Sequence, residues 1–548
     1  RTTDPWGSLG LLIAAVGLSG LVGVLFAGHW LSSVQVKAAT WMFHLTQRES
    51  LAMAARFVVA AGWIVLVPTF LLGAAFPAAL RLTAEPASSG RDTGRVLALN
   101  TLGGIVGTML AGFVLVPMLG LERSLALMSA VAATVGIVAV VKGTSVSRRL
   151  RWATFACGGL AVAVGISLGP DHLARLLAEA RHGRLLFHEA SAAGTVAVIE
   201  QGSGRNRFRR LYIQGVSNSG DSMTSLRYMR LQALLPLIIH RGTPRDVLVI
   251  GLGTGITTGS LLRYPGLERR VCAELLPAVV RGAALFEGND GVATDPRIDV
   301  RLRDGRRELL RSNDSYDLIT LEPPPPSAAG VVNLYSTDFY RLAATRLHTN
   351  GLMAQWLPLP TQTDGDTRSL VRSFLDAFPY ATLWTTELHE MLLVGSLDPI
   401  ELDAARIAAR FNQPEVAAAL REVGIASPAA LLATWVTDRA GLERYAANAQ
   451  PTTDNRPRIE YGAWVMPGEF ISTLQALNDL RTAPPLVNAD AIPEREISTE
   501  HRKLIAFYEA GIYAYQRDRL RWQETMRWLL TQDPENPYYL WFIGASDA

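Results

Sequence analysis

Charged residues are scarce in this chain of 548 residues. They make up 18% of it, whereas a soluble protein usually carries about a quarter. The deficit is concentrated before about residue 170, where Ala, Leu, Val and Gly dominate, and charges reach an ordinary frequency after that point. The length also exceeds what one compact core accommodates, so we expect several structural units. The composition therefore separates a lipid-solvated part from a water-solvated part.

Cysteine and lysine are nearly absent as well. Cys157 and Cys272 fall in different parts of the chain, which excludes a disulfide framework and a cysteine metal site. Arginine is almost the only basic residue, and the net charge is just +3. No basic run interleaves with aromatic residues, so we expect no nucleic-acid partner. His389-Glu390 lacks a second histidine at helical spacing, and we therefore expect no bound metal.

Long apolar runs fill the N-terminal part. A membrane-spanning helix needs about 20 mostly apolar residues. The segments that meet this need are Leu9–Phe26, Ala54–Phe76, Leu97–Val116, Leu125–Val141 and Trp152–Leu168. They predict an integral protein of a bacterial inner membrane, in contact with membrane lipid. Because the chain starts at Arg1 and enters an apolar helix almost at once, we hypothesise that further helices precede it in the gene product.

The charges between these segments predict an orientation. Positive charge usually marks the cytoplasmic side. The loops after the second and fourth segments carry Arg81, Arg91, Arg95, Lys142, Arg148, Arg149 and Arg151. The opposite loops hold only Lys37, Arg48 and Arg123. With five spans, this bias favours an extracytoplasmic location for the water-solvated part. No charged residue lies deep in a span, which argues against transport.

The water-solvated part reads as short strands followed by an α/β pattern. We expect strands of a small N-terminal sheet at Gly194–Glu200 and Arg210–Gln214, and a helix after them at Leu226–Ile239. The apolar run Asp246–Ile250 predicts a buried strand and leads directly into a glycine-rich turn. Such a turn between a strand and a helix lets the backbone approach a ligand closely. Gly251, Gly253 and Gly255 are therefore candidate cofactor-binding residues.

Three further predicted strands end in a carboxylate. The strands Arg270–Ala273, Ile298–Leu302 and Tyr316–Leu321 are followed by Glu274, by Asp304-Gly305 and by Glu322. Doubly wound sheets bind ligands at the edge where parallel strands end. We therefore interpret Glu274 as a ribose-binding residue, and Asp304 with Gly305 as an adenine-binding pair. The alternative is that Glu274 and Asp304 only cap helices.

This series of features resembles the spermidine synthase (polyamine aminopropyltransferase) family over roughly Arg184–Ser396. The resemblance continues through Asn333–Tyr340, Gly351–Trp356 and Phe378-Pro379. Phe76-Pro77, Asn100–Gly112 and Thr453–Tyr461 are similar to the membrane-bound, multi-span branch. The resemblance implies a nucleoside cosubstrate, decarboxylated S-adenosylmethionine or S-adenosylmethionine, and an amine acceptor.

The family's catalytic positions are only partly kept. Under the resemblance, Glu322 takes the place of the catalytic aspartate, and it is the candidate catalytic residue. Tyr228 and Gln355 are candidate acceptor-binding residues, with packing at a strand end as the alternative for Gln355. The second aspartate of the catalytic loop corresponds to Pro325, and a histidine corresponds to Met229. The nucleoside half of the site is thus retained better than the polyamine half.

The predicted fold class is multi-domain: transmembrane helices, then an α/β Rossmann-type, S-adenosylmethionine methyltransferase-like domain with a small N-terminal β-sheet subdomain and a helical C-terminal extension. The predicted boundaries are 1–170 for the membrane helices, 184–240 for the small sheet and its helix, 241–400 for the Rossmann-type domain, 401–482 for a helical extension, and 497–548 for a tetratricopeptide-like hairpin. A single hairpin cannot bury its own face, so we expect it to pack on the α/β domain.

Two functions fit these residues. The first is a membrane-anchored transferase that binds an S-adenosylmethionine-type nucleoside and uses Glu322 to orient or deprotonate an amine. The second is a non-catalytic scaffold or accessory subunit that keeps the fold and binds protein partners in a membrane complex. The missing loop carboxylate and the four prolines Pro323–Pro326 favour the second.

Overall fold

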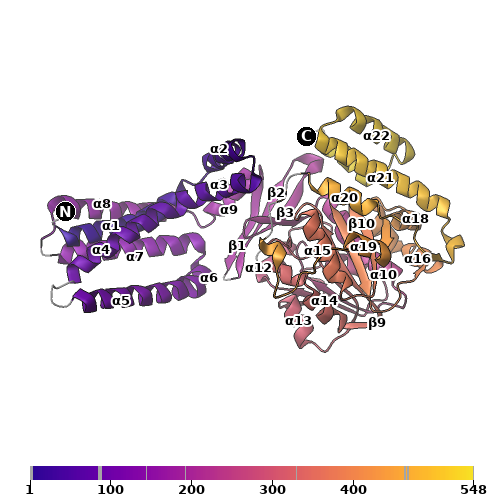
Figure 1. Cartoon of the computed structure of the whole chain (residues 1–548), viewed down its shortest axis with the longest axis horizontal. Coiled ribbons are helices and arrows are strands. Elements are labelled where there is room, and N and C mark those ends of the chain that lie inside the picture. The colour runs from indigo at the N-terminus through magenta and orange to yellow at the C-terminus, as the bar shows by residue number, and fades with distance from the viewer. Residues whose placement is uncertain are drawn as a thin grey trace. The chain divides into compact units, whose positions relative to one another are not determined.

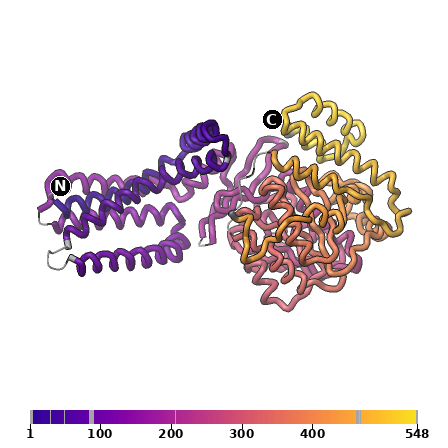
Figure 2. The backbone as a smooth tube through the Cα atoms, viewed as in Figure 1, coloured from indigo at the N-terminus to yellow at the C-terminus, as the bar shows by residue number. Residues whose placement is uncertain are grey.

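The computed structural model describes residues 4–83, 89–143, 145–191, 193–328, 330–461, 465 and 468–546. The chain separates into two compact units, Arg1–Ile199 with Ile213–Gly215, and Glu200–Tyr212 with Val216–Ala548. Figure 1 labels many of their helices and strands, and Figure 2 traces the backbone of each. Each unit is described by itself below.

The first unit is built mainly from long helices. They are α1 (Pro5–Leu25), α2 (His29–Thr46), α3 (Glu49–Ala61), α4 (Val67–Thr83), α5 (Ser89–Leu110), α6 (Val116–Leu119), α7 (Leu121–Lys142), α8 (Arg148–Ser167) and α9 (His172–Ala180). Single π-helical segments continue α3 into α4 and α5 into α6. Among the described residues, five helices are therefore long and apolar enough to cross a membrane: Pro5–Leu25, Ser50–Leu82, Gly90–Leu119, Leu121–Lys142 and Arg148–Ser167. These contain the apolar segments that the sequence predicts, apart from a residue at the ends of the first and last.

Small residues let α1 and α7 approach closely, and α1 also packs on α4 and α8 (Figure 1). A Cβ atom on Gly136 would lie 2.5 Å from the carbonyl oxygen of Gly10. The Ser129 hydroxyl donates a hydrogen bond of 3.0 Å to the Gly17 carbonyl. By contrast, a Cβ atom on Gly107 of α5 would meet nothing within 4 Å among the described residues. The close helix contact therefore lies on α1 and α7.

Four short strands follow: β1 (Arg184–Ser191), β2 (Gly194–Gln201), β3 (Phe208–Ile213) and β4 (Val216–Gly220). They form a sheet of order β1-β2-β3-β4, as the alternating pattern of the sequence predicts. The division between the two units runs through this sheet, with β1 and most of β2 on one side of it.

The second unit is built around an eight-stranded sheet of order β13-β10-β11-β9-β8-β5-β6-β7. Its strands are β5 (Asp246–Ile250), β6 (Arg269–Glu274), β7 (Asp299–Leu302), β8 (Tyr316–Leu321), β9 (Leu347–Pro358), β10 (Tyr380–Glu387), β11 (Glu390–Ser396) and β13 (Trp435–Asp438). The strands β7, β6, β5, β8 and β9 pair in parallel, and the other three are antiparallel. The strand order reverses between β5 and β8, so the ligand-binding edge of a doubly wound sheet lies where β5 and β8 end.

Helices cover both faces of this sheet. They are α10 (Met223–Ile239), α11 (Ile256–Ser260), α12 (Pro277–Ala283), α13 (Gly305–Arg311), α14 (Thr337–Ala344) and α15 (Asp364–Leu375). Both β5 and β8 are almost wholly buried, which explains their continuous apolar runs. The predicted bounds of these two strands agree with the structure.

The segment after β11 differs from the prediction of a helical extension. It contains α16 (Ala404–Phe411), α17 (Pro414–Arg421), α18 (Pro428–Leu432), α19 (Arg439–Tyr445) and α20 (Phe470–Asn478). It also contains β13, which pairs with β10 and completes the main sheet. This strand has only four residues between Ala-rich helices, so no alternating pattern reveals it. The short strands β12 (Leu402–Asp403) and β14 (Leu486–Val487) pair separately.

The chain ends in α21 (Glu494–Gln516), α22 (Arg519–Gln532) and α23 (Pro537–Ser546). Figure 1 shows α21 and α22 side by side, in agreement with their many contacts. Phe507, Met526 and Tyr538 from these helices belong to the same hydrophobic core as residues of the main sheet. The hairpin therefore packs on the α/β domain, as expected.

Candidate functional site

The glycine-rich turn joins the end of β5 to α11. Gly251, Gly253 and Gly255 have φ angles of +91°, +55° and +86°, which residues with a side chain rarely adopt. A Cβ atom on Gly255 would also lie 2.5 Å from Val292. A Cβ atom on Gly251 would lie 3.6 Å from the Glu322 carbonyl oxygen, so the turn and the end of β8 are neighbours. Because these three residues have no side chains, the backbone of the turn can approach a nucleoside closely.

Glu274 is tied to this turn. Its carboxylate accepts hydrogen bonds from the backbone N–H of Leu252, at 2.8 Å, and of Leu276, at 2.7 Å. Burial raises its pKa, and these backbone donors oppose the rise. The backbone N–H groups of Leu275 and Gly253 act on the carboxylate in the same direction. The side chain therefore orders the turn, and its contact with a ribose stays a prediction.

Asp304 and Gly305 lie where β7 leads into α13. Asp304 caps α13 by accepting a hydrogen bond of 2.8 Å from the Arg307 backbone N–H. A Cβ atom on Gly305 would lie 2.1 Å from Ile250, so glycine is required for α13 to approach β5. The capping alternative for Asp304 is thus realised, and its contact with adenine remains a proposal.

Glu322 lies immediately after β8 and faces α10. The Tyr228 hydroxyl donates a hydrogen bond to its Oε1 atom. Burial raises the pKa of Glu322 to about 7, against the opposing effect of the Tyr228 hydrogen bond. Burial also raises the pKa of Tyr228 well above its ordinary value, followed by the charges of Glu322 and Glu390. A carboxyl group that titrates near neutral pH can both accept and return a proton.

Two stacked aromatic side chains lie near Glu322. The rings of Tyr228 and Trp356 stack with centroids 6.2 Å apart and planes 25° apart. Met229 and Ile256 complete this cluster, and the Thr254 hydroxyl of the glycine turn lies 3.3 Å from the Met229 sulfur. Met229 therefore packs between α10 and the turn.

The Gln355 side chain lies on the face of the sheet opposite to that of Trp356. It precedes Trp356 on β9, and successive side chains of a strand point to opposite faces. Its amide accepts a hydrogen bond of 3.1 Å from the Tyr340 hydroxyl and donates one of 2.9 Å to the Trp356 carbonyl. The side chain is fully buried. These contacts favour the packing alternative over contact with an acceptor.

Two carboxylates at this edge escaped the sequence analysis. Glu387 ends β10 and Glu390 begins β11, so both lie at the hairpin turn between the two strands. Burial raises the pKa of Glu390 well above its ordinary range, with further contributions from the charges of Glu387 and Glu322. The one sequence feature that pointed to this hairpin was the His389-Glu390 pair. Because no second histidine follows it at helical spacing, the pair is not a zinc motif, and the sequence indicates no other role for it.

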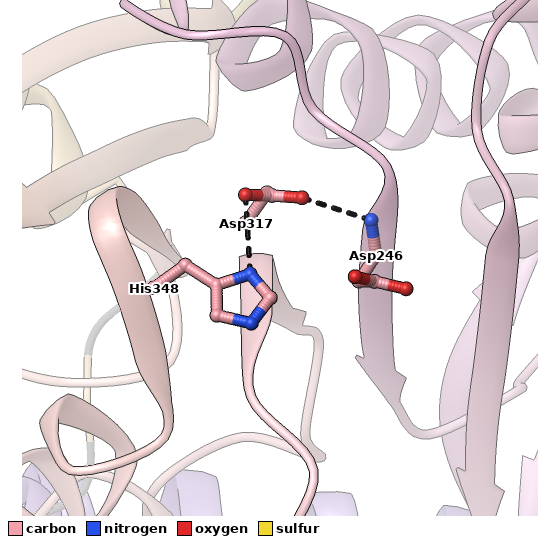
Figure 3. A group of neighbouring side chains, drawn as sticks. All are labelled: Asp246, Asp317 and His348. Atoms are coloured by element: carbon pink, nitrogen blue, oxygen red, sulfur yellow. Dashed lines mark hydrogen bonds and ion pairs between the residues drawn. The ribbon is translucent and has the colours of Figure 1, made fainter.

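Three potential metal ligands meet at the opposite edge of the sheet. Figure 3 shows Asp246, Asp317 and His348 with their ligand atoms close together. However, Asp317 already accepts hydrogen bonds from the backbone N–H of Arg245 and Asp246 and lies 3.3 Å from His348. Asp246 pairs with Arg269 at 3.1 Å. These bonds tie the beginning of β5 to β8 and account for the cluster without a metal.

A cavity of about 470 Å³ lies beside the glycine turn. Arg230 and Arg263 line it, and they pair with Glu422 and Asp290. Asn289, also in its lining, donates a hydrogen bond of 2.9 Å to the Thr254 carbonyl. Because the charges are neutralised in pairs, the lining shows no preference for an anion or a cation.

The topology and the glycine turn define an α/β domain of the methyltransferase type. Residues 226–390 match the family model of the spermine/spermidine synthase domain. Residues 226–390 therefore form a spermidine synthase-like domain.

Curated relatives agree with this assignment. A polyamine aminopropyltransferase of Nitrosomonas europaea is 35% identical over 201 residues, which cover 33% of this chain and 57% of the relative. One of Mycobacterium tuberculosis is 30% identical over 315 residues, which cover 54% and 57%. The polyamine aminopropyltransferase 2 of Ralstonia nicotianae is 30% identical and covers 63% and 66%. The chain thus spans less than two thirds of the length of these relatives.

Among solved structures, a spermidine synthase in complex with the transition-state analogue AdoDATO is similar, with 17% identity and a TM-score of 0.39. The alignment covers 48% of this chain and 87% of that structure. The spermidine synthase from Thermotoga maritima has 17% identity and a TM-score of 0.40, with coverage of 48% and 88%.

Proposed function

We propose that this protein is a membrane-anchored transferase that binds decarboxylated S-adenosylmethionine, or S-adenosylmethionine, and transfers an aminopropyl or related group to an amine. One observation carries the proposal. The glycine turn, the turn-bound Glu274 and the half-buried Glu322 lie at the edge where β5 and β8 end. This edge combines the requirements for holding a nucleoside and for moving a proton.

The chemistry requires little covalent assistance. An amine nitrogen attacks the carbon next to the sulfonium, the carbon–sulfur bond breaks, and its electron pair stays on sulfur. The products are a neutral thioether, methylthioadenosine when the donor is the decarboxylated form, and an alkylated ammonium that loses one proton. The protein has to align the amine with the carbon and keep its nitrogen unprotonated.

Glu322 is proposed as the residue that performs the proton transfer. Its pKa of about 7 lets its carboxylate accept a proton from the ammonium and return it to solvent at neutral pH. The hydrogen bond from Tyr228 fixes the carboxylate and favours its charged form. Gly251, Gly253, Gly255, Glu274, Asp304 and Gly305 are proposed to hold the nucleoside.

The five apolar helices support anchoring in a membrane with lipid as a partner. The charge bias of their loops supports an extracytoplasmic α/β domain. Labelling Ser203→Cys, an exposed position, in intact cells with a membrane-impermeant maleimide would test this side. A chain with its native cysteines alone serves as the control. Protection until the cells are opened would place the domain in the cytoplasm.

The second candidate is a scaffold or accessory subunit without catalysis. The absence of a carboxylate in Pro323–Ala328 and the internal bonds of Gln355 favour it. Under this candidate the retained fold would serve protein partners in a membrane complex.

Calorimetric titration of the purified full chain separates the two candidates. Decarboxylated S-adenosylmethionine, S-adenosylmethionine and methylthioadenosine would each be titrated into the wild type and into Glu274→Gln. The transferase proposal expects binding that Glu274→Gln weakens at least tenfold. Absence of binding by all three nucleosides would overturn it, and binding unaffected by the variant would overturn the assignment of Glu274.

A further inference from the structure

Glu390 lies at the same edge of the sheet as Glu322. β9 runs parallel to β8, and β11 runs antiparallel to β9. The beginning of β11, where Glu390 lies, is therefore at the edge where β8 ends and Glu322 follows. Residues distant in sequence are thus placed at one end of neighbouring strands.

The strand register also sets the face on which Glu390 lies. Leu392 pairs with Trp356, and Glu390, two residues earlier on β11, pairs with Pro358, two residues later on β9. Residues two apart on a strand share a face. Glu390 therefore lies on the face of Trp356, against which Tyr228 of α10 stacks. Tyr228 in turn donates its hydroxyl hydrogen to Glu322.

The hydrogen bonds of the two hairpin glutamates differ sharply. Glu387 accepts bonds from the Tyr538 hydroxyl at 2.8 Å and from the backbone N–H of His389 at 3.0 Å. In the described part of the chain, no hydrogen bond of normal geometry reaches the buried Glu390 Oε2 atom or the buried indole Nε1 of Trp356. The indole N–H lies near enough to the Glu390 carboxylate to oppose the rise of its pKa. Trp356 is only 8% exposed. Buried polar atoms without partners are costly unless a ligand satisfies them.

We propose that Glu390 is the second carboxylate of the acceptor site and binds a primary amine together with Glu322, against the rings of Tyr228 and Trp356. This inference rests on the proposed transferase function. Carboxylates form strong charge-assisted bonds with an ammonium group, and aromatic faces attract cations. Glu390 would thereby supply, from β11, the anionic partner that the loop after Glu322 lacks.

Glu322 and Glu390 can also accept the proton that the amine must lose before it reacts. The amine enters as an ammonium, one carboxylate accepts its proton, and the neutral nitrogen then attacks the carbon next to the sulfonium. The proton released from the product ammonium passes to solvent, and the carboxyl group that accepted the first proton then also returns it to solvent. The charge of Glu322 contributes to the raised pKa of Glu390, so the pair readily holds one proton before the amine enters. Glu390 acts here as a binding residue that touches the acceptor.

The test is calorimetric titration of the full chain in lipid nanodiscs. Methylthioadenosine is titrated first, and putrescine, cadaverine and butylamine are then titrated into the methylthioadenosine-saturated protein. The variants are Glu390→Gln, Glu390→Asp and, as a surface control, Glu509→Gln, which is exposed on α21. We expect Glu390→Gln to weaken amine binding at least tenfold while methylthioadenosine binding stays within twofold. Glu390→Asp, which keeps the charge, should lose less, and the control should match the wild type.

Two outcomes overturn the inference: no amine binds the wild type, or Glu390→Gln binds amines as tightly as the wild type does. Failure of methylthioadenosine to bind the wild type overturns the proposed function instead. In that case the amines are titrated into the nucleoside-free protein, and the same comparison of Glu390→Gln with the wild type decides the role of Glu390. A near-ultraviolet circular dichroism spectrum identical to the wild type verifies that the Trp356 environment of the variant is intact.

Discussion

Replacing Glu322 by glutamine should stabilise the protein at alkaline pH. Burial raises the pKa of this carboxyl group from 4.5 to about 7. Between these values the folded state binds more protons than the unfolded state, so stability falls as pH rises through this window. Glutamine keeps the shape and can accept the Tyr228 hydrogen bond, but it carries no charge to bury.

The size of the effect follows from the same shift. At about 1.4 kcal/mol per pKa unit, the shift to about 7 costs the folded state about 3 kcal/mol at pH 8 and about 1 kcal/mol at pH 5. The advantage of Glu322→Gln should therefore grow by about 2 kcal/mol between these pH values. For a domain of this size, about 2 °C of melting temperature corresponds to 1 kcal/mol, so the growth is about 4–5 °C.

The assay is the melting temperature of the full chain in nanodiscs, followed by tryptophan fluorescence at pH 5 and pH 8. Wild type and variant are compared at each pH, so that other titrating groups largely cancel. The contribution of Glu390 does not cancel, because the Glu322 charge raises the pKa of Glu390. Removing that charge in Glu322→Gln makes ionisation of Glu390 easier, which also stabilises the variant at alkaline pH. Tyr228→Phe supplies a control of opposite sign, since loss of the donor destabilises the charged carboxylate. A difference between Glu322→Gln and wild type that stays constant or shrinks from pH 5 to pH 8 would refute the reasoning.

Three further substitutions test the packing around the site and in the helical unit. Gly305→Ala would place a Cβ atom 2.1 Å from Ile250 and should destabilise the α/β domain by about 1–3 kcal/mol, whereas Gly365→Ala, with only the Thr363 hydroxyl 3.8 Å away, should not lower the melting temperature. Tyr538→Phe removes a buried donor to Glu387 and should cost about 1–3 kcal/mol in the same melting assay; an unchanged melting temperature would show that α23 does not pack there. Gly136→Leu would push a side chain into the Gly10 backbone and should lower resistance to unfolding in sodium dodecyl sulfate, whereas Gly107→Leu, with nothing within 4 Å among the described residues, should have little effect. Equal sensitivity of these two variants would contradict the contact between α1 and α7.

The strands that carry the site could be predicted because their patterns are local. Asp246–Ile250 and Tyr316–Leu321 are mostly apolar segments, each followed by a glycine or a carboxylate, and the structure gives them the predicted bounds. Glu274 and Glu322 follow from the rule that parallel strands end at one edge. These inferences require no knowledge of how distant segments pair.

The acceptor side could not be predicted, because it depends on strand register and on the face of the sheet. Gln355 and Trp356 are adjacent in sequence, yet only Trp356 faces α10 and Tyr228. Glu390 lies at the same edge as Glu322 because β11 pairs antiparallel to β9, which no local pattern specifies. The strand β13 was missed for a related reason: its four residues form a strand only because β10 offers an edge.

The pKa values of the two hairpin glutamates, Glu387 and Glu390, shift in opposite directions. Two adjacent residues of α10, Arg227 and Tyr228, contribute to this difference. Arg227 of α10 lies over the Tyr538 ring, 4.4 Å from its centroid, and donates to the Thr386 and Val423 carbonyls. Tyr538 is thereby held where its hydroxyl satisfies Glu387, whose pKa stays below the ordinary value despite burial because His389 and Tyr538 donate to it. The next residue, Tyr228, turns to Glu322 instead. His389, and after it Tyr538 of α23, thus favour the charged form of Glu387. That charge adds to the effect of burial, which raises the pKa of Glu390. The C-terminal helix therefore contributes, through Tyr538 and Glu387, to the electrostatics around Glu390.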